Sequence, residues 1–265
     1  MIQGGMIDLH CHVLPGIDDG PRTMQEAVDL ARVAHSNGIG TLVATPHVSP
    51  MHLHNDAARI AQGVADVRAA LAQEGIPVEV TTGAEVDLGR VVDLDEHELA
   101  SLRLGGGPWL LLECPLSPAA AYGFPMAARH VAGRGHRVVL AHPERSPAFH
   151  ADPVGTLGPL VKDGMLSQVT AAAFVGRFGR RVQEVAIELL RAGLVHAVAS
   201  DAHDPISRPP SIAAELAEAG VEEWTEWLAY EVPAAILEGS AIPPAPVLEP
   251  PSPLPPARRW WQLGR

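Results

Sequence analysis

Asp8-Leu9-His10-Cys11-His12, followed by Ile17-Asp18-Asp19-Gly20-Pro21, is the segment around which this chain can be understood. Side chains of a strand alternate between its two faces, so we expect His10 and His12 on one face and Cys11 on the other. Two imidazoles side by side can hold one divalent metal ion. A His-x-His pair alone is a weak signal for a metal site. The signal is strengthened because His, Asp and Glu recur later in the chain at the ends of other expected strands.

The composition indicates one large domain that does not bind nucleic acid. The chain has 265 residues, a length that α/β barrels reach as a single unit. Its 19 basic and 31 acidic residues give a net charge of −12. Phosphate backbones attract Lys and Arg, so this balance argues against a nucleic-acid partner.

The cysteine content and the N-terminus predict a cytoplasmic protein. Two cysteines, Cys11 and Cys114, make no disulfide framework and fit a reducing compartment. The first residues lack the basic and apolar regions of a signal peptide, and Met6 is an alternative start. No apolar run reaches the ~18 residues of a membrane span, so we expect no membrane insertion.

Short apolar runs alternate with segments of helical periodicity. Thr23 and Glu26 form an expected capping box at the start of the first helix. We expect strands at the His-x-His segment and at 41–45, 78–82, 109–112, 137–141, 166–169 and 196–200, and helices at about 23–37, 56–74, 118–132, 179–192, 211–220 and 224–237.

This alternation predicts a parallel sheet, and seven strands favour a (β/α)7 barrel over an open doubly wound sheet. Polar residues that can bind metals stand at the ends of five different strands: His47, Glu85, Glu113, His142 and Asp201. In a barrel, the carboxyl ends of the strands converge on one face, where the active site is built. The sequence therefore predicts one site made from residues that are distant along the chain.

The ligand types predict a hydrolytic metal centre. His, Asp and Glu suit Mn²⁺, Fe²⁺ or Zn²⁺, and several carboxylates suggest two or more ions. Such a cluster generates a bridging hydroxide for in-line attack on a phosphate ester, without a covalent phosphoenzyme. Arg145 and Arg208 each follow an expected ligand by a few residues and could bind phosphoryl oxygens.

Two other phosphate chemistries lack their residues. A cysteine-dependent phosphatase needs Cys-x5-Arg, but Ile17 follows Cys11 at that spacing and Ala120 follows Cys114. A Gly-x4-Gly-Lys-Ser/Thr phosphate loop is absent, so the sequence gives no support to an ATPase.

The chain resembles the polymerase-and-histidinol-phosphatase (PHP) superfamily, and within it the CpsB-type, manganese-dependent protein-tyrosine phosphatases of bacterial capsule and exopolysaccharide clusters. The resemblance covers most of residues 6–212. The motifs are Met6-Ile7-Asp8-Leu9-His10-Cys11-His12, Asp18-Asp19-Gly20-Pro21, Ala44-Thr45-Pro46-His47, Gly83-Ala84-Glu85, Leu112-Glu113, Ala141-His142-Pro143-Glu144-Arg145, Ser200-Asp201-Ala202-His203 and Arg208-Pro209-Pro210.

The resemblance implies a distorted TIM-like barrel with three divalent ions, of which Mn²⁺ is expected first and Fe²⁺ or Zn²⁺ are alternatives. The implied ligands are His10, His12, Glu85 and Asp201 for one ion, Glu85, Glu113 and His142 for a second, and Asp19, His47 and His203 for a third. Arg145 and Arg208 would hold the phosphate. The adjacent Asp18 is the other candidate for the aspartate ligand of the third ion, and we assign Asp19 to this position.

The resemblance further implies a phosphotyrosine protein as substrate, in particular the tyrosine-rich tail of a bacterial kinase, and some relatives form homo-oligomeric rings. The sequence departs from the family at Thr170, where an Asn is common after Gln168-Val169. A small-molecule phosphatase, such as a histidinol-phosphatase, is the alternative enzyme. A degenerate PHP domain that serves as a structural or binding module is the alternative outside the enzymes.

The chain divides into an expected phosphatase domain, 1–240, and a proline-rich C-terminal tail, 241–265, which does not belong to the family pattern. The tail ends in a segment with paired Trp260 and Trp261, which either dock on the domain or bind a partner.

Overall fold

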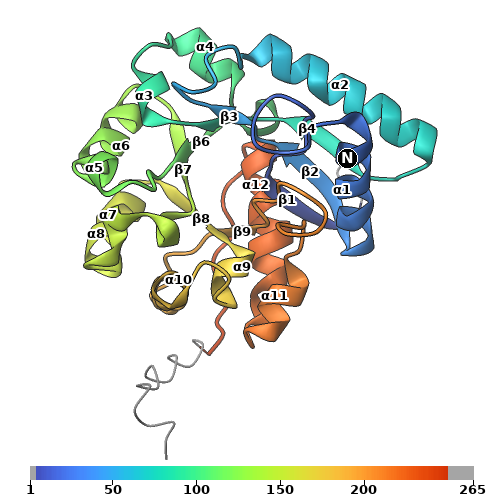
Figure 1. Cartoon of the computed structure of the whole chain (residues 1–265). Coiled ribbons are helices and arrows are strands. Elements are labelled where there is room, and N and C mark those ends of the chain that lie inside the picture. The colour runs from blue at the N-terminus through green and yellow to red at the C-terminus, as the bar shows by residue number, and fades with distance from the viewer. Residues whose placement is uncertain (1–3, 250–265) are drawn as a thin grey trace, which may run out of the picture.

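The computed structural model describes residues 4–249, in which parallel strands alternate with helices (Figure 1). The strands are β1 (Met6–Cys11), β2 (Ile39–Ala44), β3 (His47–Val48), β4 (Glu79–Thr82), β5 (Glu85–Val86), β6 (Trp109–Glu113), β7 (Arg137–Ala141), β8 (Leu166–Thr170) and β9 (Ala197–Ala199). The helices are α1 (Met24–Ser36), α2 (Ala57–Glu74), α3 (Leu88–Val91), α4 (Glu96–Ser101), η1 (Leu104–Gly106), α5 (Pro118–Ala121), α6 (Phe124–Gly133), η2 (Pro143–Arg145), α7 (Pro147–His150), α8 (Pro153–Lys162), α9 (Ala171–Phe174), α10 (Arg180–Arg191), α11 (Ala213–Glu218), η3 (Glu222–Trp224), η4 (Trp227–Glu231) and α12 (Val232–Glu238).

The strands form two parallel sheets, ordered β1-β2-β4 and β3-β5-β6-β7-β8-β9. Each of the expected strands 41–45 and 78–82 has a short continuation, β3 and β5, which pairs in the second sheet. The first of these breaks falls beside Pro46, which has no N–H for a ladder hydrogen bond. The prediction of a parallel α/β architecture is confirmed.

The ends of β1 and β9 also meet. Cys11 and Ala202 form a single parallel bridge, the N–H of His12 donates to the carbonyl oxygen of Ala202 at 2.9 Å, and the N–H of Asp201 donates to that of His10 at 2.9 Å. These contacts bring the first strand of one sheet beside the last strand of the other. Among the described residues the ladder is interrupted between the two sheets, so it is not one continuous closed ladder.

The helices cover the outer faces of both sheets. In Figure 1, α1 and α2 lie on the side of β2 and β4, and α5 to α8 lie on the side of β6 to β8. Apolar side chains fill the space between the layers, and the largest fully buried ones include Phe124, Phe149 and Phe174. This packing holds the carboxyl ends of the strands in fixed relative positions.

Local signals predicted the first two helices. Thr23 caps α1 through its hydroxyl, which accepts from the N–H of Glu26, and the Glu26 carboxylate accepts from the N–H of Thr23. The helix α2 ends at Gly75, whose φ of +65° is the left-handed conformation that favours glycine.

The prediction of one helix over 118–132 was wrong. The segment forms α5 and α6, which are separated by Tyr122 and Gly123. Gly123 has a φ of +79°, which a continuing α-helix cannot accommodate, and Pro125 fits the first turn of the new helix.

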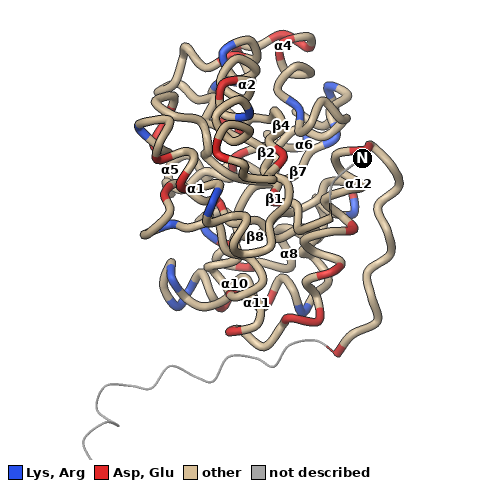
Figure 2. Tube along the Cα trace, turned by 90° about the vertical axis from the view of Figure 1, so that its right-hand side faces the viewer, with Lys and Arg blue, Asp and Glu red and all other residues tan. Residues whose placement is uncertain are grey.

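The chain beyond α12 has neither helix nor strand up to residue 249, and Figure 2 shows it running along one side of the molecule. The indole N–H of Trp227 donates to the carbonyl oxygen of Pro243 at 3.2 Å, and Ile242 and Leu248 pack partly buried against the core. The start of the expected tail is therefore in contact with the domain. Trp260 and Trp261 lie outside the described residues.

Within residues 4–249, none of the helices combines the length and apolar character needed to cross a membrane.

Candidate metal centre

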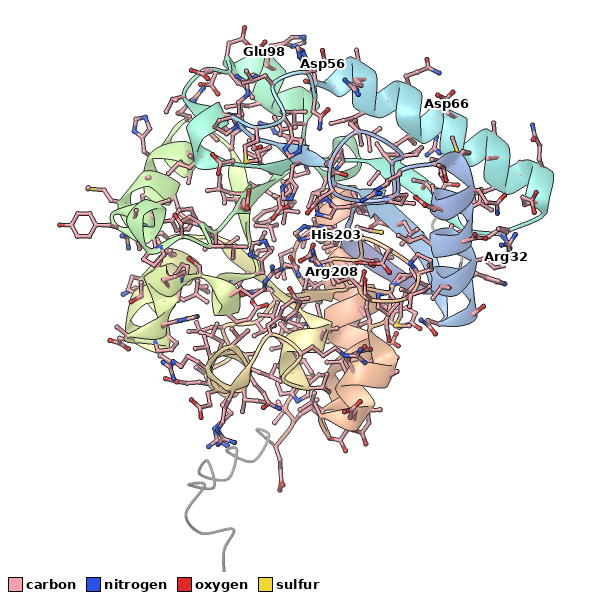
Figure 3. The ribbon with its side chains drawn as sticks, viewed as in Figure 1. Arg32, Asp56, Asp66, Glu98, His203 and Arg208 are labelled. Carbon is pink, nitrogen blue, oxygen red and sulfur yellow. The ribbon has the colours of Figure 1, made fainter. Side chains whose placement is uncertain are left out.

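All nine residues expected to bind metals come together where the strands end. In Figure 3, His203 lies near the centre of the molecule, whereas charged residues such as Arg32 and Glu98 lie at its edge. The cluster consists of four overlapping groups: His12, Asp19, His47 and His203; His10, His142 and Asp201; His10, His12 and Glu85; and His47, Glu85 and Glu113. Within each group, one ligand atom per residue lies within 4.8 Å of every other.

Four of these residues are the ones expected to hold the first ion. The Nε2 atoms of His10 and His12 are 3.3 Å apart. Oε2 of Glu85 lies 3.3 Å from the first nitrogen and 3.5 Å from the second, and Oδ1 of Asp201 lies 3.4 Å from each. A tetrahedral ion with bonds of about 2.1 Å separates its ligand atoms by about 3.4 Å. The two imidazoles therefore have this spacing from each other and from each carboxylate oxygen.

Two further side chains orient these histidines. Nδ1 of His10 lies 2.9 Å from Oε1 of Gln168, and Nδ1 of His12 lies 2.8 Å from Oδ2 of Asp18. An acceptor at Nδ1 fixes the tautomer that leaves Nε2 free for a metal. Gln168 could not be identified from local sequence patterns, because it lies 158 residues from His10 in the chain and the two meet only in the folded protein.

Asp18 and Asp19 take different positions. The Asp18 side chain is fully buried and also accepts from the N–H groups of Gly20 and His47, at 3.0 and 3.1 Å. The Asp19 side chain is 59% exposed, and its Oδ1 lies 3.2 Å from Nε2 of His203 and 3.6 Å from Nε2 of His47. Asp19 thus faces the third expected set, whereas Asp18 supports His12.

Glu85 connects the groups through both of its oxygens. Its Oε1 lies 2.7 Å from Nε2 of His142, and its Oε2 lies 3.0 Å from Nδ1 of His47. The second expected set combined Glu85, Glu113 and His142, but the geometry groups Glu113 with His47, and His142 with His10 and Asp201. Glu85 therefore lies between His142 and His47, and its role as a bridging ligand stays a prediction.

Two of the cluster residues have an uncommon backbone conformation. Within residues 4–249, His142 and Asp201 are the non-glycine residues with positive φ, at +37° and +52°. His142 follows β7 directly, and Asp201 follows β9 after one intervening residue, where the chain turns out of the sheet. Such conformations cost free energy and often accompany functional sites.

The electrostatics show strong pairing between imidazoles and carboxylates. Burial alone would lower the pKa of His10, but the charges of Glu85 and Asp201 raise it. Burial alone would raise the pKa of Glu85, but His10 and its neighbours hold it well below the usual range. Burial, with the negative charge of Glu85, raises the pKa of Glu113 to about 7. The charges of His10 and Glu85 therefore stabilise each other, whereas burial lowers the pKa of His142 and of His203.

Arg145 and Arg208 meet at the same carboxylate. Oδ1 of Asp201 faces the histidines, whereas its Oδ2 accepts from Arg208 at 2.6 Å and from Arg145. The guanidinium carbon of Arg145 also lies 4.4 Å from the ring centroid of Phe178. Both cations are therefore beside the metal-ligand cluster, as the sequence predicted.

Two cysteines and two histidines of the loop after β3 are less suited to the hydrolysis of a phosphate ester. Cys11 and Cys114 are buried and free, and burial raises the pKa of both thiols well above its usual value. A neutral thiol is a poor nucleophile. His52 bonds to Ser49 and stacks on His47 at 5.6 Å between centroids, whereas His54 is exposed.

A parallel α/β fold with imidazoles and carboxylates at the strand ends and two arginines beside them is typical of metal-binding hydrolases that act on anionic substrates. The chain belongs to the capsular polysaccharide synthesis family CpsB/CapC, which matches residues 6–238. The tyrosine-protein phosphatase YwqE of Bacillus subtilis is 33% identical over 203 residues, which are 77% of this chain and 79% of the relative. The putative tyrosine-protein phosphatase CapC of Staphylococcus aureus is 29% identical over 211 residues, again 77% and 79%.

Solved structures agree with this assignment. A chain from the crystal structures of YwqE from Bacillus subtilis and CpsB from Streptococcus pneumoniae, described as unique metal-dependent tyrosine phosphatases, matches with a TM-score of 0.78 and 30% identity. The match covers 94% of this chain and all of that chain. A 5-methylcytosine deaminase from Klebsiella pneumoniae, with a TM-score of 0.54 and 14% identity, shares the fold alone.

Proposed function

We propose that this protein is a metal-dependent protein-tyrosine phosphatase that acts in capsule or exopolysaccharide synthesis. The observation that carries the proposal is that the Nε2 atoms of His10 and His12 lie 3.3 Å apart and 3.3 to 3.5 Å from carboxylate oxygens of Glu85 and Asp201, next to two arginines. The family and its curated relatives supply the substrate class, phosphotyrosine in proteins.

We propose that the cluster holds three divalent ions, with Mn²⁺ as the expected metal and Fe²⁺ or Zn²⁺ as alternatives. The donors fit such ions, since imidazoles and carboxylates suit borderline and hard cations. When bound, such ions lower the pKa of water and neutralise charge on the phosphate. The nine ligands would be His10, His12, Asp19, His47, Glu85, Glu113, His142, Asp201 and His203.

Arg145 and Arg208 would bind the phosphate. Their guanidinium groups converge at Oδ2 of Asp201, so both can reach oxygens of one phosphoryl group placed beside the cluster. Asp18 and Gln168 would keep the imidazoles of His12 and His10 in the orientation needed for metal binding.

Several wider features belong to the same proposal. The two sheets would be arcs of one distorted barrel of the PHP superfamily, since Cys11 of β1 pairs with Ala202 in the segment after β9. The phosphatase domain would end near residue 240.

The partner would be the phosphorylated tail of a bacterial tyrosine kinase. The two proteins would interact in the cytoplasm, a reducing compartment in which the two buried cysteines stay free. Homo-oligomer formation stays a prediction.

The test compares turnover of a phosphotyrosyl peptide and of histidinol phosphate by the Mn²⁺-loaded protein. We expect a strong preference for the peptide, which chelator and His12→Ala abolish and which Cys11→Ser retains. A preference for histidinol phosphate would replace the substrate assignment. Failure to bind divalent metal, measured by calorimetric titration, would instead support a binding module.

A further inference from the structure

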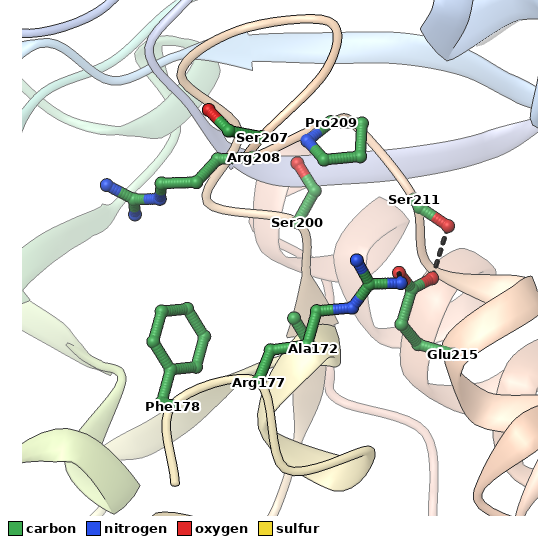
Figure 4. Close-up of a pocket in the computed structure, with 9 residues that line it drawn as sticks. All are labelled: Ala172, Arg177, Phe178, Ser200, Ser207, Arg208, Pro209, Ser211 and Glu215. Atoms are coloured by element: carbon green, nitrogen blue, oxygen red, sulfur yellow. Dashed lines mark hydrogen bonds and ion pairs between the residues drawn. The ribbon is translucent and has the colours of Figure 1, made fainter.

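A small pocket lies beside Arg208 (Figure 4). Its volume is about 140 Å³, and its lining comes from the segments that follow β8 and β9. Arg208 lines the pocket directly, and Phe178, which also lines it, carries the guanidinium of Arg145 over its ring. A group esterified to a phosphate held by these arginines is therefore next to the pocket.

The size and walls of the pocket suit an aromatic ring. A protein cavity of about 150 Å³ is large enough to bind benzene. Phe178, Pro209 and Ala172 contribute apolar surface, and in Figure 4 Arg208 and Phe178 lie on the side opposite Glu215. An aromatic ring can stack on the face of Phe178 and on the guanidinium planes.

The charges of the pocket disfavour a second anion. Arg177 pairs with the nearly buried Glu215 at 3.3 Å, and Arg208 pairs with Asp201 at 2.6 Å. Each cation that lines the pocket thus has a carboxylate partner. A neutral ring gains from this surface, whereas an additional phosphate or acidic side chain would also approach these carboxylates.

We propose that the pocket between Phe178 and Arg208 is the subsite for the phenyl ring of the phosphotyrosine substrate. This inference rests on the proposed function, because it assumes that an aryl phosphate enters the site. Phe178, Ala172 and Pro209 would then determine specificity by contacting the ring and not the phosphate.

Filling the pocket tests this inference. Ala172 is a partly exposed residue of α9, so Ala172→Leu adds volume to the pocket without removing a charge or hydrogen bond. We expect kcat/KM for a phosphotyrosyl peptide to fall by about tenfold or more, mainly through KM. The inhibition constant of inorganic phosphate, which has no ring, should change by less than about twofold. Ala172→Val should give a smaller loss, and Ala65→Leu on the exposed face of α2 is the matched control.

Two results would overturn the subsite. An unchanged KM in Ala172→Leu would show that the ring lies elsewhere. An equal rise of KM and of the phosphate inhibition constant would show that the substitution acts through the arginines. Both require that the wild-type protein hydrolyses phosphotyrosine, and a wild-type protein that turns over only alkyl phosphates would reject the proposed function and the subsite with it.

Discussion

Each histidine of His10-Cys11-His12 owes the orientation of its imidazole to one side-chain contact. Gln168 contacts Nδ1 of His10, and Asp18 contacts Nδ1 of His12. The Nε2 atom of each imidazole therefore points into the cluster. Cys11, between them, lies in the core with no exposed surface. Strand alternation predicted these directions, but it could not identify the residues that hold each imidazole in one tautomer.

Gln168→Leu should weaken metal binding by about ten- to a hundredfold, because His10 Nδ1 would lose its buried acceptor. Calorimetric titration with Mn²⁺ measures the change. Gln168→Glu keeps an acceptor at this position and should restore most of the affinity, whereas Gln62→Leu, on the exposed face of α2, should leave it unchanged. Equal affinity in Gln168→Leu and the wild type would reject this orienting role.

At the scale of elements, the loop after β1 depends on one close backbone approach. A Cβ added at Gly20 would lie 2.3 Å from the carbonyl oxygen of His12, which is too close for any side chain. The amide of Gly20 also donates to Asp18. The Asp-Asp-Gly-Pro sequence therefore has a steric reason for its glycine.

Gly20→Ala should lower the free energy of unfolding by about 1 to 3 kcal/mol and impair metal binding, since the loop carrying Asp18 and Asp19 must move. Chemical denaturation and metal titration measure the two effects. Gly158→Ala, in the helix α8 with no atom near the added Cβ, is the control and should be neutral or stabilising by up to about 1 kcal/mol. A Gly20→Ala protein as stable as this control would contradict the steric argument.

The strand β9 begins beside His196, a partly buried histidine that does not belong to the cluster. Burial lowers the pKa of His196 to about 4, below its unfolded value of about 6.5. Between these values the unfolded chain binds the extra proton, so stability falls as pH decreases from about 6.5 towards 4. Above pH 6.5 this residue imposes no such cost.

His196→Gln should therefore flatten the pH dependence of unfolding between pH 6.5 and 4, by roughly 1 to 3 kcal/mol over the window. Urea denaturation at a series of pH values measures it. The exposed His97→Gln is the control, and identical slopes for the wild type and His196→Gln would show that this residue does not contribute.

At the scale of the whole molecule, the cluster joins segments from residue 10 to residue 203. Its residues follow or end strands of both sheets, so ions bound there would connect most of the domain. Acidic and basic residues are otherwise scattered over the chain trace in Figure 2. Metal binding should consequently stabilise the fold as a unit and not only a local loop.

Removal of metal by chelation should lower the melting temperature. A ligand at a hundred times its Kd contributes about 2.7 kcal/mol, which is a shift of roughly 5 to 10 °C for a domain of this size. Thermal unfolding with chelator, and again after adding Mn²⁺, measures the loss and its recovery. Mg²⁺ at equal concentration is a useful comparison, because it suits imidazole ligands poorly. A melting temperature indifferent to all divalent ions would argue against the metal centre.

The sequence by itself determined the alternation of strands and helices, the capping of α1, and the types of residue at the strand ends. These are local properties, since periodicity and capping act over a few residues. Only the tertiary structure decided that Glu113 lies with His47, that Gln168 supports His10, and that Phe178 lies under Arg145. Such pairs depend on how twisted strands and their connecting loops are placed in space, and no short-range pattern in the chain encodes that placement.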